Sequence, residues 1–447
     1  MLQSQRPDIQ ILIDEHKAEL SKPLGSRTVT RLEKFLVALQ KVQDAPSSQG
    51  NLSYFYLASY HGLSSDSVYR TQRSNVPSQF RTRRFCPHGL PEFPAWHRAY
   101  LSLFEKALQS HDPSVLLPFW NEIRTPDPVT GYPSFFDEQT YQKVDGSSLK
   151  NPLSSYTPTE SINFRGISGL NPNQTTRNSS RILRYLTNQI STDVKSAFKQ
   201  ATYELFAYNS STSRLSVENP HNNIHGFVGG WMGLVELSAF DPIFWLHHCF
   251  IDNLFWQWQV LSNQTNRIEY SRNHLQLVPF RKNSNAFYTI NEIANVAQFN
   301  YSYAEIDREA LGRASRESRR ALFGQLGRPV VGKEEGSKKE FFINGILFSD
   351  FGGSFRVDVT ANTGSGPVPL GTQTVFRFSK ECINCEISPG TSVSFRMKNV
   401  KIEDEGDITF LVKFALNSGS KVEFSKQLQP GMRVLHRIMN SNLELVY

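Results

Sequence analysis

The chain contains eleven histidines, and seven of them form two groups along the sequence. The first group consists of three separated histidines: His61, His88 and His97. The second group consists of two close pairs: His221 with His225, and His247 with His248. Histidines four residues apart share one face of a helix, whereas adjacent ones point about 100° apart. We therefore expect only one histidine of the adjacent pair to share a metal ion with His221 and His225.

Each group thus offers three imidazoles, with no set of thiolates or carboxylates beside them. Imidazole suits copper, zinc, iron and nickel, whereas hard cations require oxygen ligands. Two neighbouring sites of three neutral imidazoles, each with open positions, suit a pair of copper ions that share one dioxygen molecule. Two one-electron metals together reduce dioxygen to peroxide without releasing a radical. A dizinc hydrolase is disfavoured because no bridging carboxylate accompanies the histidines.

Three stretches carry a resemblance to a known family: CPHGLPEFPAWHRAYLSLFE, HNNIHGFVGG and FDPIFWLHHCFIDNLFWQWQ. They resemble the copper motifs of the type-3 copper proteins, which are tyrosinases, catechol oxidases and molluscan haemocyanins. The resemblance covers most of residues 54–260. Two positions depart from the family pattern: residues 119–122 read FWNE where a YWDW-like segment is usual, and Asn253 stands where an arginine is usual. We interpret both as scaffold positions.

The resemblance implies a set of copper ligands. The first copper ion, CuA, would be bound by three histidines: His61, His88 and His97. The second, CuB, would be bound by His221, His225 and His248. His247 matches the paired histidine that is not a ligand in the family.

The resemblance also implies an activity. A tyrosinase or polyphenol oxidase uses a dicopper–peroxide centre to hydroxylate monophenols at the ortho position and to oxidise o-diphenols to o-quinones with dioxygen, as in melanin biosynthesis. Its partner is a small phenolic or catecholic substrate. Two alternatives stay open: a catechol or o-aminophenol oxidase without monophenol hydroxylation, and a haemocyanin-like carrier that binds dioxygen reversibly. A single unit argues against a carrier, because carriers are usually long chains of several units.

The four cysteines have separate interpretations. Cys86 lies two residues before His88, where fungal tyrosinases and molluscan haemocyanins join a cysteine to the histidine by a thioether bond. The resemblance implies the same bond here, and a buried free thiol is the alternative. Cys249 is interpreted as a small packed residue. Cys382 and Cys385 form a CxxC that resembles the copper-loading pair of fungal pro-tyrosinases, with a disulfide as the alternative.

Further residues are candidates for catalysis and substrate binding. A free phenol has a pKa near ~10, so a base or a positioned water assists its binding to copper. By resemblance, Glu218 and Asn222 would hold such a water near CuB, although an acid at a helix N-terminus is favourable in any case. Gly226 and Val235 match positions near the substrate entrance of the family, and Phe227 could stack on a substrate ring or belong to the core.

The elements around these residues can be predicted from periodicity. Apolar residues at helical spacing predict five helical regions: 27–44, 96–110, 178–207 as two helices with the second at 191–208, 219–228 and 243–260. From residue 341, short runs of period two separated by Gly, Asn and Pro predict a β-sandwich or barrel. Helices with inward-facing ligands are a common way to build a metal site.

We therefore expect a multidomain fold: a mainly α helical-bundle dicopper core at 1–305, a charged linker at 306–340 and a C-terminal β-sandwich at 341–447. Residues 301–303, YSY, resemble the Tyr-x-Tyr motif that closes the catalytic domain of fungal tyrosinases. The β-domain is expected to lie over the copper site as a lid, with an apolar or aromatic side chain in place of substrate. The chain would then be a latent zymogen, and the linker is a candidate site of activating cleavage.

Composition limits the remaining classes. A formal charge of +7 over 447 residues is weak support for nucleic-acid binding. The sequence contains no stretch of ~20 apolar residues that could span a membrane. The N-terminal residues lack the features of a signal peptide, so we expect a cytoplasmic or a processed secreted protein. A homo-oligomer stays open.

Overall fold

A computed structural model provides the structure of the chain. The residues that it describes are 4–62, 85–123, 132–162, 173–177, 183–209, 215–304, 340–347, 351, 353–376, 390–396, 408–416, 421–427, 433–438 and 441–446. Almost all of the expected linker and both cysteines of the CxxC, Cys382 and Cys385, lie outside these residues.

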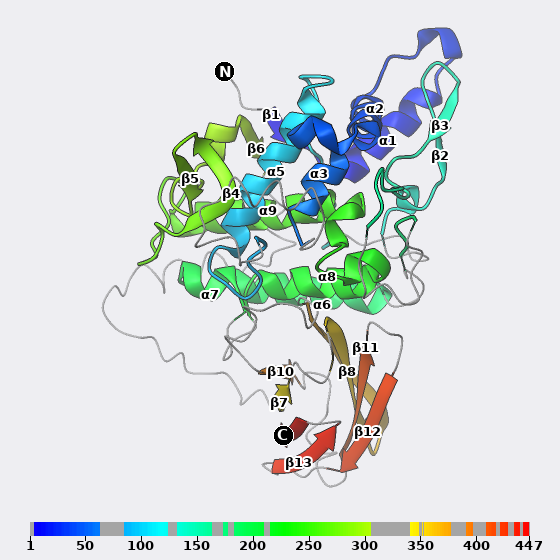
Figure 1. Cartoon of the computed structure of the whole chain (residues 1–447). Coiled ribbons are helices and arrows are strands. Elements are labelled where there is room, and N and C mark those ends of the chain that lie inside the picture. Colours follow the sequence, from blue (N-terminus) through cyan, green and yellow to red (C-terminus); the bar gives the residue numbers. More distant parts are fainter. Residues whose placement is uncertain are drawn as a thin grey trace.

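The first part of the chain is built from helices (Figure 1). The described α-helices are α1 (Ile9–Leu20), α2 (Arg31–Asp44), α3 (Tyr54–Ser59), α5 (Phe93–Gln109), α6 (Leu183–Ala197), α7 (Tyr203–Ala207), α8 (Glu218–Val228) and α9 (Ile243–Ser262). Short 3-10 turns lie between them: η1 (Leu24–Ser26), η2 (Ser47–Leu52), η4 (Ser134–Phe136), η5 (Gly230–Gly233), η6 (Ser238–Phe240) and η7 (Val296–Phe299). Short strands accompany them: β1 (Ser4–Arg6), β2 (Thr140–Gln142), β3 (Ser148–Lys150), β4 (Gln276–Asn283), β5 (Ala286–Thr289) and β6 (Tyr301–Tyr303).

Four of the predicted helices are confirmed as α2, α5, α8 and α9, with ends that differ by a few residues. The second helix predicted in the region 178–207 is wrong in its bounds. Helix α6 continues through the expected break to Ala197, and α7 starts at Tyr203. The separation falls before Thr202, whose hydroxyl accepts a hydrogen bond from the backbone of Leu205 and so caps α7.

Helix α9 is apolar on all sides, which is typical of a helix at the centre of a domain, and almost all of its residues are buried. It packs against α5 and α8. The helix ends where Asn263 takes the left-handed conformation, with φ of 58°. Because α5, α8 and α9 carry most of the candidate ligands, this packing brings the two histidine groups together.

A buried arginine joins the start of the chain to the end of the helical part. Strand β1 pairs in parallel with β6. The guanidinium of Arg6 donates to both carboxylate oxygens of Glu105, at 3.0 and 2.9 Å, and to the hydroxyl of Tyr303 at 2.8 Å. It lies 3.4 Å from Asp252 and 3.5 Å from the ring centroid of Tyr301. Since Glu105 is on α5 and Asp252 on α9, this cluster holds the two central helices against the β1–β6 pair.

The C-terminal part is built from strands, as predicted. They are β7 (Glu340–Leu347), β8 (Phe355–Thr363), β9 (Gly366–Val375), β10 (Gly390–Arg396), β11 (Thr409–Leu416), β12 (Lys421–Gln427), β13 (Arg433–Ile438) and β14 (Ser441–Val446). They form two four-stranded sheets, with the orders β10-β7-β14-β13 and β12-β11-β8-β9. Apolar residues of β7, β8, β10 and β11 share one cluster, apart from the helical core. The β-region is therefore a second unit with its own core.

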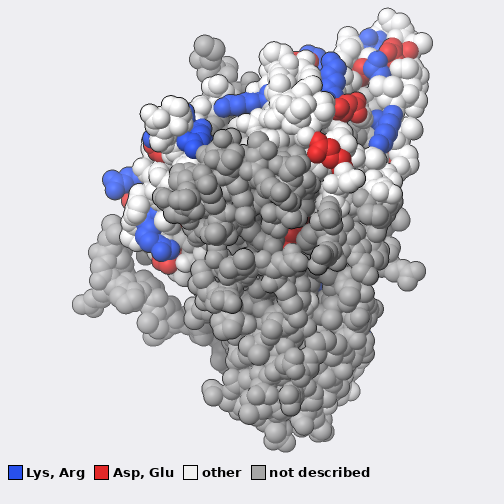
Figure 2. Space-filling view, in the orientation of Figure 1, with Lys and Arg blue, Asp and Glu red and all other residues white. Residues whose placement is uncertain are grey.

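On the face drawn in Figure 2, the described residues are not separated into a basic side and an acidic side. Basic and acidic side chains alternate over the helical part, without a large patch of one sign among the residues described there. Within the described part of the chain, no helix is both long enough and apolar enough to cross a membrane.

The Arg6 cluster generates a prediction about stability. Removing one member of a buried ionic group typically costs about 3–5 kcal/mol, because its partner charges lose their counterion. We expect Arg6→Met to lower the free energy of unfolding by about 3 kcal/mol in urea denaturation of the copper-loaded protein. Arg31→Met, which removes an exposed pair with Glu15, is the control and should change it by less than about 0.5 kcal/mol. Equal effects of the two substitutions would contradict the role given to Arg6.

Candidate metal centre

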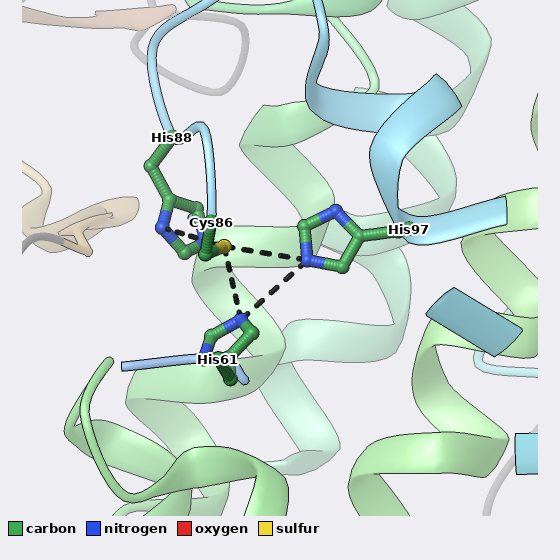
Figure 3. Close-up of side chains that lie close together, drawn as sticks. All are labelled: His61, Cys86, His88 and His97. Carbon is green, nitrogen blue, oxygen red and sulfur yellow. Dashed lines mark hydrogen bonds between the residues drawn. The ribbon is translucent and has the colours of Figure 1, made fainter. Parts of the chain in front are cut away.

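The structure brings the first histidine group together around Cys86 (Figure 3). His61 follows α3, His97 lies on α5, and His88 lies in the turn before α5. The Sγ atom of Cys86 is 3.1 Å from Nε2 of His61, 3.5 Å from Nε2 of His97 and 3.5 Å from Nδ1 of His88. Burial, and then the nearby charge of Glu218, raises the pKa of the Cys86 thiol. The sulfur therefore lies among all three imidazoles as a neutral thiol.

The second group joins α8 to α9. His221 and His225 lie one turn apart on α8, as the spacing predicted. The Nε2 atom of His248, on α9, is 3.3 Å from Nε2 of His221 and 3.3 Å from Nε2 of His225. All three side chains are fully buried. The residues chosen from sequence thus meet at one point.

Hydrogen bonds at Nδ1 set the tautomers of four of these histidines. Each donates Nδ1–H to an oxygen at 2.7–2.9 Å: His61 to the carbonyl of Val235, His97 to that of Phe93, His225 to that of Met232, and His221 to the side-chain oxygen of Asn222. A carbonyl oxygen can only accept, so the ring proton is on Nδ1 and Nε2 keeps its lone pair. Val235, predicted from its place in the family motif, contributes here through its backbone.

The donor set fits a metal ion. In the second group, the bare Nε2 atoms of His221 and His225 each face Nε2 of His248 at 3.3 Å. A single Nε2–H on His248 could satisfy only one of these two lone pairs, whereas a cation among the three nitrogens would be bound by both. Imidazole–metal bonds of about 2.0–2.1 Å in a tetrahedral arrangement place their nitrogens roughly 3.3 Å apart. Burial lowers the pKa of His61 to about 3 and lowers the pKa values of the other five well below the ordinary value. All six imidazoles are therefore neutral, the form that binds metals.

The adjacent histidine, His247, has a different environment. Its Nδ1 atom is 2.5 Å from Oε1 of Glu122. Burial raises the pKa of Glu122 and lowers the pKa of His247 to about 3, so both groups favour their neutral forms. A neutral carboxyl donates to Nδ1, and the ring proton of His247 is then on Nε2, which has no lone pair for a metal. This agrees with the expectation that one histidine of the pair is not a ligand.

Glu122 is a residue that the sequence interpretation missed. It lies in FWNE, the segment that departs from the family pattern, and it was interpreted as part of the scaffold. Its hydrogen bond to His247 connects that departure to the metal centre, because the ring of His247 stacks on His221 with centroids 5.1 Å apart. The usual YWDW-like segment carries its acid at the third position, whereas FWNE carries Glu122 at the fourth. This shift of one position was the signal available in the sequence.

The two groups face each other. The rings of His97 and His248 stack with centroids 4.2 Å apart and an interplanar angle of 18°. The rings of His88 and His221 lie 5.4 Å apart. Imidazoles of the two groups are therefore in direct contact, which is the arrangement needed for two ions to act on one small molecule.

The predicted catalytic residues lie beside the second group. The carboxylate of Glu218 is buried and accepts hydrogen bonds from the backbone N–H groups of Gly89 and Asn209, at 2.8 and 2.7 Å. It thereby ties the turn that carries His88 to the start of α8. Asn222, one helical turn further, accepts the Nδ1 proton of His221 at 2.9 Å. Both residues thus have positioning contacts beside the histidines.

An aromatic ring from the C-terminal part covers the histidines. Phe376, directly after β9, stacks on His225 with centroids 4.0 Å apart and an angle of 11°. It also lies edge-on to His88 at 5.1 Å. Phe376 belongs to the core cluster of the helical part rather than to that of the sheets. Sequence alone did not single it out, because it is one of 32 phenylalanines.

The three predicted pocket residues have different environments. Gly226 faces β9, where an added Cβ would come within 2.2 Å of the Thr374 hydroxyl. The glycine therefore permits the close approach of that strand. Phe227 and Val235 are buried members of the helical core.

Known proteins share these features. A family model described as the common central domain of tyrosinase matches residues 51–261. A tyrosinase of Streptomyces galbus is 36% identical over 208 residues, which are 43% of this chain and 72% of that protein. A tyrosinase of Aspergillus oryzae is 27% identical over 345 residues, 56% of this chain and 62% of that protein. Hemocyanin 1 of Megathura crenulata is 28% identical over 54% of this chain and 7% of its own length.

Among solved structures, the tyrosinase of Burkholderia thailandensis superposes with a TM-score of 0.69 at 21% identity, covering 95% of this chain and 100% of the other. At that identity the likeness shows the fold. The chain spans less than two thirds of the length of the Aspergillus tyrosinase that it matches. The chain is a member of the tyrosinase family of type-3 dicopper proteins. Its cofactor is a pair of copper ions.

The contrast between the adjacent histidines gives a prediction about copper content. His248→Gln removes an Nε2 lone pair that faces two other nitrogens, so we expect the bound copper to fall from two ions to about one per chain. His247→Gln removes a ring whose Nδ1 is occupied by Glu122, so we expect the copper content to stay near two. Elemental analysis of the two variants after copper loading measures this. The reverse result would exchange the roles of the two histidines.

Proposed function

We propose that this chain is a copper-dependent phenol oxidase of the tyrosinase type, which hydroxylates monophenols and oxidises o-diphenols to o-quinones with dioxygen. Copper ions held by the two histidine groups supply the exchange of electrons with dioxygen. The ring of Phe376 carries the proposal, because it lies against His225 and His88 at 4.0 and 5.1 Å. A phenol carries the same ring, so it fits the same place beside both groups.

The ligand assignment is part of the proposal. His61, His88 and His97 hold the first copper ion, and His221, His225 and His248 hold the second. The convergence of Nε2 atoms within each group supports it. Three backbone carbonyls and the side-chain oxygen of Asn222 accept from Nδ1 and keep four of the six rings in fixed orientations, which lets both ions bind without rearrangement.

The proposal includes latency. Phe376 occupies the place of the substrate ring, so the C-terminal part at 341–447 acts as a lid, with its two sheets completing a β-sandwich. The helical domain at 1–305 is then inactive until the lid is displaced. Cleavage in the linker at 306–340 would displace it. The buried position of Phe376 supports this, since its exposed fraction is only 4%.

Glu218 and Asn222 are proposed to hold a water that takes the proton of the incoming phenol. Both lie on α8 within one turn of His221, and a carboxylate at this place can act as the base. Its hydrogen bonds to Gly89 and Asn209 fix its position. The side chain therefore does not need to move when a phenol enters.

Cys86 is proposed to form a thioether with His88. The two side chains are in contact, with Sγ 3.5 Å from Nδ1. Dioxygen would accept the two electrons and two protons released when the carbon–sulfur bond forms, so the crosslinked peptide is lighter by two hydrogen atoms in mass spectrometry, and an unchanged mass means a free thiol. Copper loading by Cys382 and Cys385 stays a prediction of the resemblance.

The first experiment measures oxygen uptake by the full-length, copper-loaded protein with a monophenol and with catechol. We expect little turnover before limited trypsin digestion and a rise of at least tenfold after it, because the lid ring blocks the site. Turnover of catechol alone would indicate a catechol or o-aminophenol oxidase. Reversible dioxygen binding without turnover in either form would indicate an oxygen carrier and contradict the proposal.

A substitution within the intact chain separates displacement of the lid from cleavage. The backbone N–H of Thr374 donates to Asn223 at 2.8 Å, and so it points away from β8. Thr374→Pro removes this donor without removing a hydrogen bond of the β8–β9 ladder, and we expect higher activity without trypsin. Thr374→Ala keeps the N–H and is the matched control.

The role of Glu218 is tested by the ratio of two activities. Glu218→Gln removes the base, so we expect the kcat/KM for monophenol to fall by roughly 100-fold and the kcat/KM for catechol to fall much less. Copper content should stay at two ions per chain. An equal loss for both substrates would mean that Glu218 only anchors the backbone at Gly89 and Asn209.

A further inference from the structure

The helical domain holds strand β9 by its main chain. The sheet that contains β8 and β11 reaches α6 and α8 in Figure 1, and β9 is its edge strand. The side-chain oxygen of Gln189, on α6, accepts from the backbone N–H of Thr372 at 3.0 Å, and its amide nitrogen donates to the carbonyl of the same residue. The oxygen of Asn223, on α8, accepts from the N–H of Thr374 at 2.8 Å. Two side-chain amides thus take the place of a neighbouring strand.

These contacts do not depend on the side chains of β9. They involve peptide groups at residues 372 and 374, which repeat every two residues as in any extended strand. Phe376 stands two residues further along, at the next position of this repeat, and its ring stacks on His225. The amide of Asn223 is itself held, because its nitrogen donates to Asp193 at 3.1 Å.

The side chain at the middle position packs closely on the helical domain. Thr374 is buried against Gly226, where a Cβ on the glycine would lie 2.2 to 2.9 Å from the threonine side chain. Its hydroxyl is buried without a hydrogen-bond partner among the described residues. The helical domain therefore binds the extended backbone by hydrogen bonds here and accepts a small side chain at this position.

We propose that the open enzyme takes tyrosine within an extended polypeptide as substrate. Asn223 binds the N–H two residues before the tyrosine, and Gln189 binds the peptide group four residues before it. This rests on the proposed function and names its substrate class. The peptide replaces β9, as in other cases where an extended segment adds its main-chain hydrogen bonds to a protein.

The chemistry is that of the proposed reaction. One oxygen atom of dioxygen forms a bond to the ring carbon ortho to the hydroxyl, and the other leaves as water. The tyrosyl side chain and one dioxygen thus give a peptidyl o-quinone and one water. No reductant beyond the phenol itself is needed, because the quinone carries the oxidation.

A peptide copied from the lid tests this. The probe is acetyl-Gly-Thr-Gln-Thr-Val-Tyr-amide, the sequence of residues 371–376 with F376Y, and the reference is N-acetyl-tyrosinamide. Both are assayed by oxygen uptake with the full-length, copper-loaded, trypsin-treated protein and with Thr374→Pro. Each main-chain hydrogen bond typically changes kcat/KM by roughly three- to tenfold. We expect the peptide to exceed the reference by about tenfold or more.

Methylation of single peptide nitrogens shows whether the backbone is read. A methyl group on the peptide nitrogen two residues before the tyrosine blocks the hydrogen bond to Asn223. We expect it to remove most of the increase in kcat/KM that this hydrogen bond contributes. A methyl one residue before the tyrosine lies on the opposite edge and is the matched control. In Asn223→Ala the two methylated peptides should be oxidised equally while N-acetyl-tyrosinamide is still turned over, a combination that an unfolded variant cannot produce.

The outcomes separate the two proposals. No turnover of N-acetyl-tyrosinamide or catechol overturns the proposed function, and this inference with it. Turnover of both small substrates with no advantage for the peptide, or with equal effects of the two methyl positions, overturns only the inference.

Discussion

The metal centre depends on one kind of interaction, the hydrogen bond from a histidine Nδ1–H to a carbonyl oxygen. Burial keeps each of these imidazoles neutral, and the hydrogen bond fixes the tautomer and the orientation in which Nε2 faces the other histidines of its group. The segment between α8 and α9 supplies two of these oxygens. The carbonyl of Met232 holds His225 of the second group, and that of Val235 holds His61 of the first. One short segment therefore sets the orientation of histidines in both groups.

That segment begins with two glycines for a steric reason. Gly229 and Gly230 have φ values of 59° and 56°, which side chains rarely adopt. A Cβ on Gly230 would also lie 1.9 Å from the carbonyl oxygen of Thr176. The turn ends α8 at Val228 and places the carbonyl oxygen of Met232 2.8 Å from Nδ1 of His225. The glycine pair in HNNIHGFVGG is thus part of the geometry of the metal centre.

The sequence predicted the features that repeat or match within a short segment. The spacing of apolar residues predicted α2, α5, α8 and α9, and the spacing of the histidine pairs predicted candidate ligands on α8 and α9. Contacts between distant segments carried no such signal. Phe376 reaches His225 from a strand 151 residues away, and Asn223 meets Thr374 over an equal separation in sequence. Glu122 could not be assigned to His247 for the same reason, since only the fold brings an isolated acid to a buried ring.

The same main-chain contacts suit the proposed lid, which would have to close the site and still be able to leave it. An edge strand needs partners for its outward N–H and C=O groups, and Gln189 and Asn223 supply them. These few hydrogen bonds are weak individually, and they suffice while the strand is covalently attached, because a tether gives an effective concentration on the order of mM. Cleavage of the tether removes that advantage without altering any contact. A lid held by its backbone is therefore stable in the intact chain and replaceable afterwards, whereas a lid held by a large apolar interface would stay bound.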